Sequence, residues 1–335
     1  MGALAGGVSG HSGHHHYIVT EDLYPLMREW AKRFGFTVPD QRWFAMNHKQ
    51  LRMALEKTLE SSDSVVIVDS LPYTYVLEEI QALVQGLLHR YEIPADNVIS
   101  LDRVYGLEMA CQHHLLETNR LTHLDNKTID HVARPHSMPV DEQVDKIIRN
   151  MNPPYRALVV DDGIWSGDSM RWVLSCLEKC SIKVKAVVVG VYIKRFGHTN
   201  DHLASLEKLS AVQTYERSRP VLDWVCERDF FVGTPLGGRT IANHEHDPGL
   251  QDWQSVGAFY STNETWLKDW ASINSNPRPF MNFCIDRSMA IFAEIRELSR
   301  RPVLMQHLER LPIQAIEENV SLDTPVCKYL ERLLV

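Results

Sequence analysis

Two adjacent carboxylates and a cluster of small residues stand together between residues 161 and 169. Asp161 and Asp162 follow an apolar run at 157–160, and the small residues after them lead into an amphipathic segment at 170–177. Backbone N–H groups of such a turn, together with a helix N-terminus, attract phosphate, and Ser166 and Ser169 add hydroxyl donors. Carboxylates at the end of a strand bind ribose hydroxyls or a phosphate-bound Mg²⁺. The pattern predicts a sugar-phosphate site. The alternative, an ordinary strand-to-helix turn, leaves the acidic pair unexplained.

This stretch resembles the phosphoribosyl diphosphate (PRPP) motif of type I phosphoribosyltransferases. In that family an apolar run and two acidic residues precede three apolar or variable positions and the sequence Thr-Gly-Gly/Ala-Thr. Asp161 and Asp162 match the acidic pair, and Gly167 matches a glycine. Ser166 and Ser169 stand in place of the two threonines. The resemblance implies that the acidic pair is catalytic and binds Mg²⁺.

The same resemblance assigns the 5-phosphate of PRPP to the turn, with contacts from Gly163, Ser166, Gly167, Asp168 and Ser169. Two positions depart from the family pattern. Trp165 stands where some members carry an Asp that takes a proton from the base. Asp168 replaces a small residue, and its charge disfavours phosphate unless the carboxylate points away or meets the metal.

Two further segments have counterparts in the family. A pyrophosphate loop would lie at 69–74, with contacts from Ser70, Leu71 and Tyr73. The loop has no Gly, Arg or Lys, so it would hold phosphate less strongly than a cationic loop, and a plain turn is the alternative. Residues 104–154 occupy the place of a mobile flap. Its candidate contacts are Lys127, Arg134, His136 and Ser137, and a solvated loop is the alternative for each.

The base-binding residues are expected after the fourth strand. Lys194 resembles a lysine of purine-type members whose ammonium faces a purine carbonyl, although a solvated lysine at a strand end is the alternative. Trp224 resembles the aromatic residue that stacks on the base, and packing at the sheet edge is its alternative. The Gly-rich segment 233–239 carries one cation, Arg239, which can approach pyrophosphate or base, but glycine serves tight turns equally well.

Helices and strands alternate along the chain in a way that can position these residues. Apolar runs predict strands at 65–68, 98–101, 157–160, 186–193 and 230–232. Helical spacing predicts helices at 21–34 after Thr20, 47–60, 76–91, 140–151 and 170–177. This order indicates an α/β fold with a parallel sheet covered by helices on both faces, as in type I phosphoribosyltransferases.

The expected organisation has three parts. Residues 1–60 form an N-terminal helical addition, 61–240 the phosphoribosyltransferase-like core, and 241–335 a mostly helical C-terminal region with helical spacing at 291–298 and 303–311. The C-terminal region has three interpretations: a packing layer, a homodimer surface or a substrate lid.

Composition excludes several classes of protein. The chain has 335 residues, a net charge of −8 and 44% hydrophobic residues, without an apolar run long enough for a membrane span. The acidic balance argues against nucleic-acid binding. The six cysteines are scattered, which favours a reducing cytoplasm over a disulfide framework. The His clusters at 14–16, 113–114 and 244–246 lack zinc-ligand spacing.

The sequence therefore favours a cytoplasmic, Mg²⁺-dependent pentosyltransferase that acts on small molecules. It would transfer ribose 5-phosphate from PRPP to a nucleobase-like acceptor and release pyrophosphate. Lys194 and Trp224 favour an oxo-bearing purine-like base, while a pyrimidine or a non-nucleobase acceptor stays open. The competing hypothesis is a PRPP- or nucleotide-sensing regulatory protein without transfer activity, because the pyrophosphate loop lacks a cation.

Overall fold

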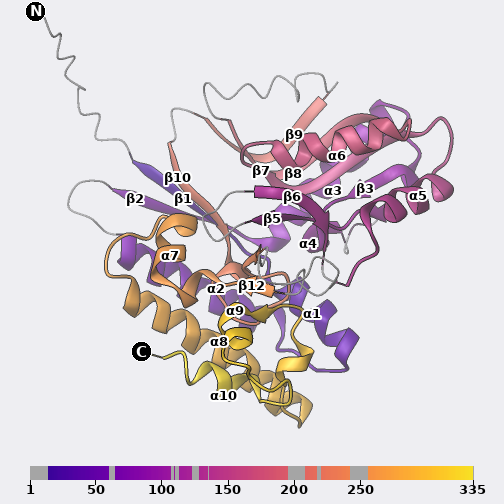
Figure 1. The fold of residues 1–335 in the computed structure, drawn as a ribbon. Helices are drawn as coiled ribbons and strands as arrows, with labels where there is room; N and C mark the ends of the chain where they lie inside the picture. The colour runs from indigo at the N-terminus through magenta and orange to yellow at the C-terminus, as the bar shows by residue number, and fades with distance from the viewer. Residues whose placement is uncertain are drawn as a thin grey trace, which may run out of the picture.

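The structure is a computed structural model that describes residues 14–59, 65–106, 109, 113–122, 128–134, 136–194, 208–216, 220–241 and 256–334. Within these residues the strands form three sheets (Figure 1). Lys127 and the His244–His246 cluster lie outside them.

The acidic pair belongs to a parallel sheet with the strand order β4-β3-β7-β8-β9. Its strands are β3 (Val98–Ser100), β4 (His113–Leu115), β7 (Arg156–Ile164), β8 (Lys183–Ile193) and β9 (Lys208–Tyr215). Every neighbouring pair is parallel. The strands predicted at 98–101, 157–160 and 186–193 are therefore confirmed, and β9 was not predicted.

Helices cover both faces of this sheet, as the apolar strands require. On β7, Leu158 and Val160 pack with α3 (Tyr73–Arg90), whereas Ala157 and Val159 pack with α5 (Val140–Asn150) and α6 (Asp168–Lys179). Successive residues of a strand point to opposite faces, so one apolar run fills two cores. The predicted α/β class, with parallel sheets flanked by helices, is confirmed.

A second parallel sheet, ordered β10-β1-β2, stands apart from the first. Its strands are β1 (His15–Thr20), β2 (Val66–Leu71) and β10 (Val221–Cys226). β1 lies between the other two and pairs with both. The prediction of one sheet that holds both the 65–68 strand and the acidic pair was wrong, because β2 finds its partner in the N-terminal segment.

The third sheet is mixed and has the order β13-β12-β11-β5-β6. Its strands are β5 (Thr118–Thr122), β6 (Thr128–Ala133), β11 (Arg239–Ile241), β12 (Val256–Ala258) and β13 (Leu311–Pro312). β5 and β6 are antiparallel and lie in the segment expected to form a flap. That segment also contains α4 (Arg103–Gly106) and α5, so most of its described part has regular structure.

The remaining helices gather at the end of the molecule opposite to α6 (Figure 1). They are α1 (Leu23–Phe34), α2 (Gln41–Leu59), α7 (Glu264–Ala271), α8 (Pro277–Ser299), α9 (Ile313–Glu317) and α10 (Val326–Leu330). Four short 3₁₀ turns complete the described elements: η1 (Ala95–Asn97), which contacts β4 and β7, and η3 (Glu227–Asp229), η5 (Tyr260–Thr262) and η6 (Met305–His307). Residues of α1, α2, α7, α8 and α10 share one core with β1 and β10. None of the helices in the described part of the chain is both long and apolar enough to cross a membrane.

Two predicted elements were wrong. Residues 230–232 form a buried turn after η3, where Phe230 packs edge-on against Phe280 at a centroid distance of 5.3 Å and Val232 N–H donates to Ser288 Oγ at 2.9 Å. Residues 303–311 contain η6 and the start of β13 in place of a helix. In both segments the apolar residues are buried in the core. Apolar residues can be buried from a turn as well as from a strand or helix, so their spacing predicted the wrong secondary structure.

Candidate functional site

The acidic pair lies near the end of β7, shortly before the turn into α6. Asp161 is the register partner of Val189 on β8, and the strand continues to Ile164. A short turn follows, and α6 begins at Asp168. Gly167 precedes α6 with a φ of 82°, a left-handed conformation that glycine adopts without strain. The strand, turn and helix predicted from the sequence are confirmed.

A cavity of about 590 Å³ lies at this edge of the sheet. Eight residues predicted for the site line it: Asp161, Asp162, Gly163, Ser166, Gly167, Asp168, Ser169 and Trp224. Other lining residues come from β5, β6, β10, β11, η3 and α7, so all three sheets contribute to one cavity. Its volume falls within the range of small-molecule sites.

Carboxylates crowd the part of the cavity next to β7. Burial and the neighbouring charges of Asp162 and Asp102 raise the pKa of Asp161 well above its usual range. Asp102 follows β3, the strand beside β7, and accepts the N–H groups of Val104 and Tyr105 at 2.9 and 2.7 Å. Burial, and then Asp162, raise the pKa of Asp102 to about 6. A bound cation would stabilise this group of carboxylates in their ionised form.

Arg134 and Arg228 bring positive charge to the same cavity. Arg134 follows β6 and donates to the carbonyl oxygens of Thr118 at 2.9 Å and Leu101 at 2.7 Å. Arg228 belongs to η3, forms an ion pair with Asp22 and lies 3.6 Å from Asp162, measured from Nη2 to Oδ2. Burial disfavours the charge of Arg228, but Asp22 and its other acidic neighbours hold its pKa well above the usual range.

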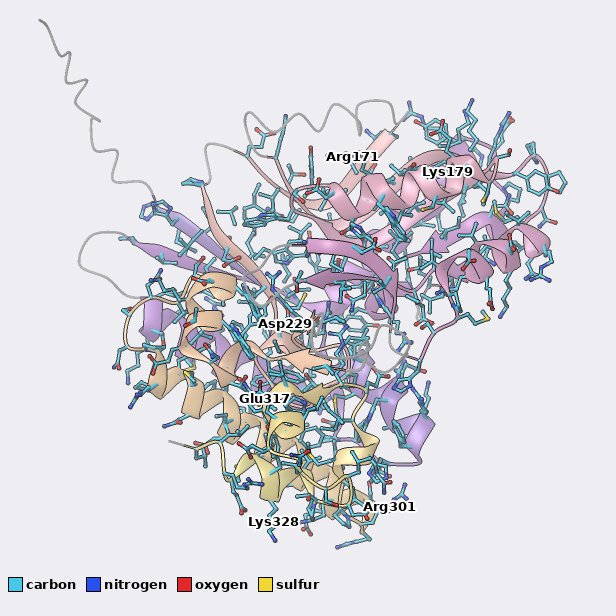
Figure 2. All side chains as sticks on the ribbon, in the orientation of Figure 1. Arg171, Lys179, Asp229, Arg301, Glu317 and Lys328 are labelled. Atoms are coloured by element: carbon cyan, nitrogen blue, oxygen red, sulfur yellow. The ribbon has the colours of Figure 1, made fainter. Side chains whose placement is uncertain are left out.

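Arg239, on β11, is the third cation, and its guanidinium lies over the rings of Trp270 at 5.0 Å and Tyr260 at 5.8 Å. Among the described residues, Arg134 Nη1, Arg228 Nε and Arg239 Nε are buried and have no hydrogen-bond partner. Buried N–H groups of a cation are costly without an acceptor. The three arginines therefore favour an anionic group in the cavity. In Figure 2, Asp229 of η3 marks this region, between the parallel sheet and the C-terminal helices.

The β5–β6 hairpin reaches the N-terminus of α6. Arg120 and His131 are directly opposite each other in the antiparallel register, and both line the cavity. His131 Nε2 lies 3.2 Å from Ser169 Oγ, and its ring stacks on Trp172 at 4.9 Å. Burial, and then Arg120, lower the pKa of His131, so its ring is neutral at pH 7. The hairpin thus adds a cation and an imidazole to the predicted phosphate cradle.

The negative charge of Asp168 is compensated by a neighbouring arginine. Its Oδ1 lies 3.1 Å from Arg171 Nη1, one turn further along α6, a residue labelled in Figure 2. The Asp168 side chain is 60% exposed. Its carboxylate is therefore screened by solvent and by Arg171, while its backbone N–H still belongs to the turn.

Trp224 forms a fixed wall of the cavity beside Gly163. A Cβ atom at Gly163 would lie 2.3 Å from Trp224 Cη2, so the indole packs directly on the β7 backbone. The indole N–H donates to Thr20 Oγ1 at 2.8 Å, which fixes the plane of the ring. Trp224 thus both lines the cavity and packs on the sheet, and Gly163 is the residue that allows the close approach.

The predicted pyrophosphate loop does not reach this cavity. Ser70 Oγ lies 2.6 Å from His48 Nε2, and Leu71 is buried at the end of β2. Tyr73 N–H donates to Glu21 at 3.1 Å, and its ring stacks on Tyr105 at 5.8 Å. None of the three lines the cavity. The prediction assumed that the loop after the first predicted strand lies beside the acidic pair. It was wrong because β2 joins the other parallel sheet.

Lys194 does not line the cavity either. Its ammonium lies 3.5 Å from Glu216 Oε1, and its side chain is 57% exposed. Of the four flap candidates, Arg134 lines the cavity, whereas Ser137 Oγ donates to Glu117 at 2.7 Å and His136 is exposed. Lys127 lies outside the described residues.

Several residues of the site were missed from the sequence: Asp102, Arg120, His131, Arg228, Asp223, Asp229, Asp269 and Trp270. Two signals were available. Asp102 directly follows the predicted strand 98–101, and Asp223, Arg228 and Asp229 lie within five residues of the predicted stacking residue Trp224. Arg120, His131, Asp269 and Trp270 depend on contacts between segments distant in sequence.

The described residues contain no group of three or more His, Cys, Asp or Glu side chains arranged to hold a metal ion. Asp161 and Asp162 nevertheless suit Mg²⁺, which keeps several waters and binds one or two carboxylates together with substrate phosphates. The oxygen donors and the raised pKa of Asp161 both fit such a cation.

Comparison with known proteins identifies no family. No family model matches the chain, and no curated protein matches it. Among solved structures, it is similar to a hypothetical protein from Neisseria gonorrhoeae that was crystallised with bound ppGpp. The two are 17% identical over 44% of this chain and 82% of the other, with a TM-score of 0.30. A likeness this weak does not indicate a function. The function is therefore inferred from the residues of the cavity.

Proposed function

We propose that this protein is a Mg²⁺-dependent phosphoribosyltransferase of the type I kind, which transfers ribose 5-phosphate from PRPP to a nucleobase-like acceptor. The observation that carries the proposal is a single cavity that joins the acidic pair of β7, the turn into α6 and the side chains of three arginines. PRPP requires these three chemistries together: a phosphate cradle, oxygen acceptors for ribose hydroxyls, and positive charge for the diphosphate.

Each part of PRPP has a suitable group of residues. The 5-phosphate would bind the turn 166–169, where backbone N–H groups, two hydroxyls and the α6 N-terminus favour an anion. His131 and Arg120 of the hairpin would close over it. The ribose hydroxyls would donate to Asp161 and Asp162.

The diphosphate would face Arg134, Arg228 and Arg239, each of which has one buried N–H group without an acceptor within the described residues. These arginines supply the cations that the segment 69–74 lacks. Guanidinium groups bind phosphate oxygens in a planar, bidentate geometry, so even one or two of them would orient a leaving diphosphate.

The reaction is a substitution at the anomeric carbon. A ring nitrogen of the acceptor forms the new C–N bond, while the C–O bond to the diphosphate breaks and its electron pair leaves with the diphosphate. The proton that the ring nitrogen carried passes to the departing diphosphate or to solvent. The transition state is oxocarbenium-like, and the carboxylates near the ribose offset its positive charge. The remaining catalysis comes from holding the two reactants in line. Mg²⁺, when bound with PRPP, neutralises charge on the departing diphosphate.

The direct test is pyrophosphate release from PRPP and Mg²⁺ in the presence of a panel of purine, pyrimidine and smaller heteroaromatic bases. We expect turnover with at least one base, and a strong loss in the Asp161→Asn, Asp162→Asn double variant. Asp145→Asn is the matched control, because Asp145 is exposed on α5 and does not line the cavity. Equal turnover by the double variant and the control would contradict the proposal.

A PRPP- or nucleotide-sensing protein without transfer activity is the second candidate. The observation in its favour is that the 69–74 segment adds no group to the cavity. A sensor must bind its ligand but need not stabilise a departing diphosphate. Calorimetry with PRPP and Mg²⁺, run beside the pyrophosphate assay, separates the two functions. Binding without turnover across the panel supports the sensor, and turnover with any acceptor excludes it.

A further inference from the structure

The part of the cavity beyond Gly163 differs from the phosphate cradle in its chemistry. We call it the acceptor end and define it by Asp223 and Trp224 of β10, Asp269 and Trp270 of α7, and Ser272. Ser272 Oγ donates to Asp223 Oδ2 at 2.8 Å, which ties the segment after α7 to β10. In addition, the Tyr17 hydroxyl of β1 donates to the carbonyl oxygen of Ala271 at 2.8 Å. The acceptor end is therefore built on a fixed framework.

Trp224 gives this end a flat aromatic wall next to the acidic pair. Its ring is fixed between Gly163 of β7 and Thr20 of β1. Trp270 is less suited to stacking, because one face contacts Trp266 at 5.2 Å and the Arg239 guanidinium lies 5.0 Å from its centroid. A planar ring that enters the cavity would therefore stack on Trp224, at the place where β7 carries Asp162.

Hydrogen-bond acceptors dominate the surroundings of this wall. Asp223 accepts the backbone N–H of Trp224 at 2.8 Å as well as the Ser272 hydroxyl, and each carboxylate oxygen has a second lone pair. Because the Ser272 proton is directed to Asp223, its oxygen is an acceptor toward the cavity. Asp269 adds a second carboxylate at the exposed rim. The Arg239 guanidinium is held over the rings of Tyr260 and Trp270.

Resting on the proposed function, we propose that the acceptor is a planar heteroaromatic base that presents an exocyclic amine to Asp223, and that its oxo-bearing counterpart is discriminated against. An amine donates to a carboxylate, whereas an oxo group in the same place puts two acceptors against each other and forms no hydrogen bond with Asp223. Sites that hydrogen-bond a substrate group reject analogues that cannot form the bond. This reverses the preference for an oxo-bearing base that Lys194 suggested.

The test compares matched bases with the full chain, PRPP and Mg²⁺: adenine against hypoxanthine, and cytosine against uracil. Each pair differs in an amine and an oxo group on nearly the same ring. The loss of a hydrogen bond to a charged group should give the amino base roughly a tenfold or larger preference in kcat/KM over the oxo base. Asp223→Asn should reduce turnover of the amino base and narrow this preference, whereas Asp145→Asn should leave it unchanged. PRPP affinity of Asp223→Asn, measured by calorimetry, shows that the variant remains folded.

The outcomes separate this inference from the proposed function. Turnover with a preference for the oxo base, or with no preference, overturns the inference and leaves the transferase in place. If no base is turned over, the transferase fails, and calorimetry of the four bases with PRPP-saturated protein decides the inference. Tighter binding of adenine and cytosine, weakened by Asp223→Asn, then supports an amine-reading pocket. Equal or weaker binding of these two bases overturns it.

Discussion

Replacing Gly163 by alanine should disturb both the Trp224 wall of the cavity and the pairing of β7 with β8. The new Cβ would lie 2.3 Å from Trp224 Cη2, 2.8 Å from Trp224 Cζ2 and 2.8 Å from the carbonyl oxygen of Val191. Carbon atoms in contact are separated by about 3.5–4.0 Å, so the indole would have to retreat by more than about 1 Å. It cannot do so freely, because its N–H is bonded to Thr20.

The second clash, with Val191, cannot be relieved by a side chain. Val191 is the register partner of Gly163 on β8, so its carbonyl moves only if the β7–β8 ladder opens. Overpacking of this kind costs about 1–3 kcal/mol of unfolding free energy, and loss of the Trp224–Thr20 hydrogen bond adds about 1 kcal/mol. We therefore expect Gly163→Ala to be destabilised by about 2–4 kcal/mol and to bind an aromatic acceptor more weakly.

Urea unfolding of three variants measures this effect. Gly86→Ala is the matched control, because Gly86 is exposed within α3 and a Cβ there meets nothing within 4 Å. Alanine should stabilise that helix by about 0.5–1 kcal/mol. Adding Trp224→Leu to Gly163→Ala should recover part of the lost stability, since the two positions are coupled. A Gly163→Ala protein as stable as the wild type would refute the packing that places Trp224 against β7.

Three other changes have defined outcomes. The Asp161→Asn, Asp162→Asn double variant should lower turnover at least about tenfold. In the wild type, burial raises the pKa of Asp161, and only the ionised carboxylate binds Mg²⁺. Calorimetry should therefore show that the wild-type affinity for PRPP with Mg²⁺ increases with pH. Asp102→Asn should gain stability relative to the wild type, by up to about 3 kcal/mol, as pH rises from 4 to 6 in urea unfolding. The reason is that burial raises the pKa of Asp102 from 3.8 to about 6, so the folded protein holds this proton more tightly than the unfolded chain. His131→Ala, which removes the ring beside Ser169, should weaken PRPP binding roughly three- to tenfold in calorimetry, and unchanged affinity would remove His131 from the phosphate cradle.

Local sequence was sufficient to predict the centre of the site. The apolar run, the acidic pair and the small-residue turn lie within 157–169, and the structure forms them as β7, a turn and α6. Such a segment is specified by neighbouring residues: the apolar strand is buried on both faces, and Gly167 supplies the left-handed conformation before the helix. The α/β class followed from the same kind of local alternation.

Pairing between distant segments could not be predicted in this way. β1 begins with His15 and His16, a polar start that gives no strand signal, and its partners on β10 lie more than two hundred residues away. Once β1 is inserted, β2 belongs to a different sheet from β7, and the loop after β2 no longer faces the acidic pair. A strand's own sequence indicates that it is a strand, but its sheet is decided by its partners.

The positive charge of the cavity illustrates the same limit and changes the interpretation of the missing cation. Arg134 follows a hairpin strand, Arg228 belongs to a 3₁₀ turn and Arg239 to a third-sheet strand. Arg134 and Arg239 are each candidate contacts from the sequence, but their spacing does not indicate that they share one cavity with Arg228. The absence of Arg and Lys from 69–74 suggested a loop that holds a diphosphate less strongly than a cationic loop. Since three guanidinium groups reach the cavity from elsewhere, that absence does not argue against transfer. Catalytic charge depends on where side chains converge, and a loop without cations limits turnover only when no other element supplies them.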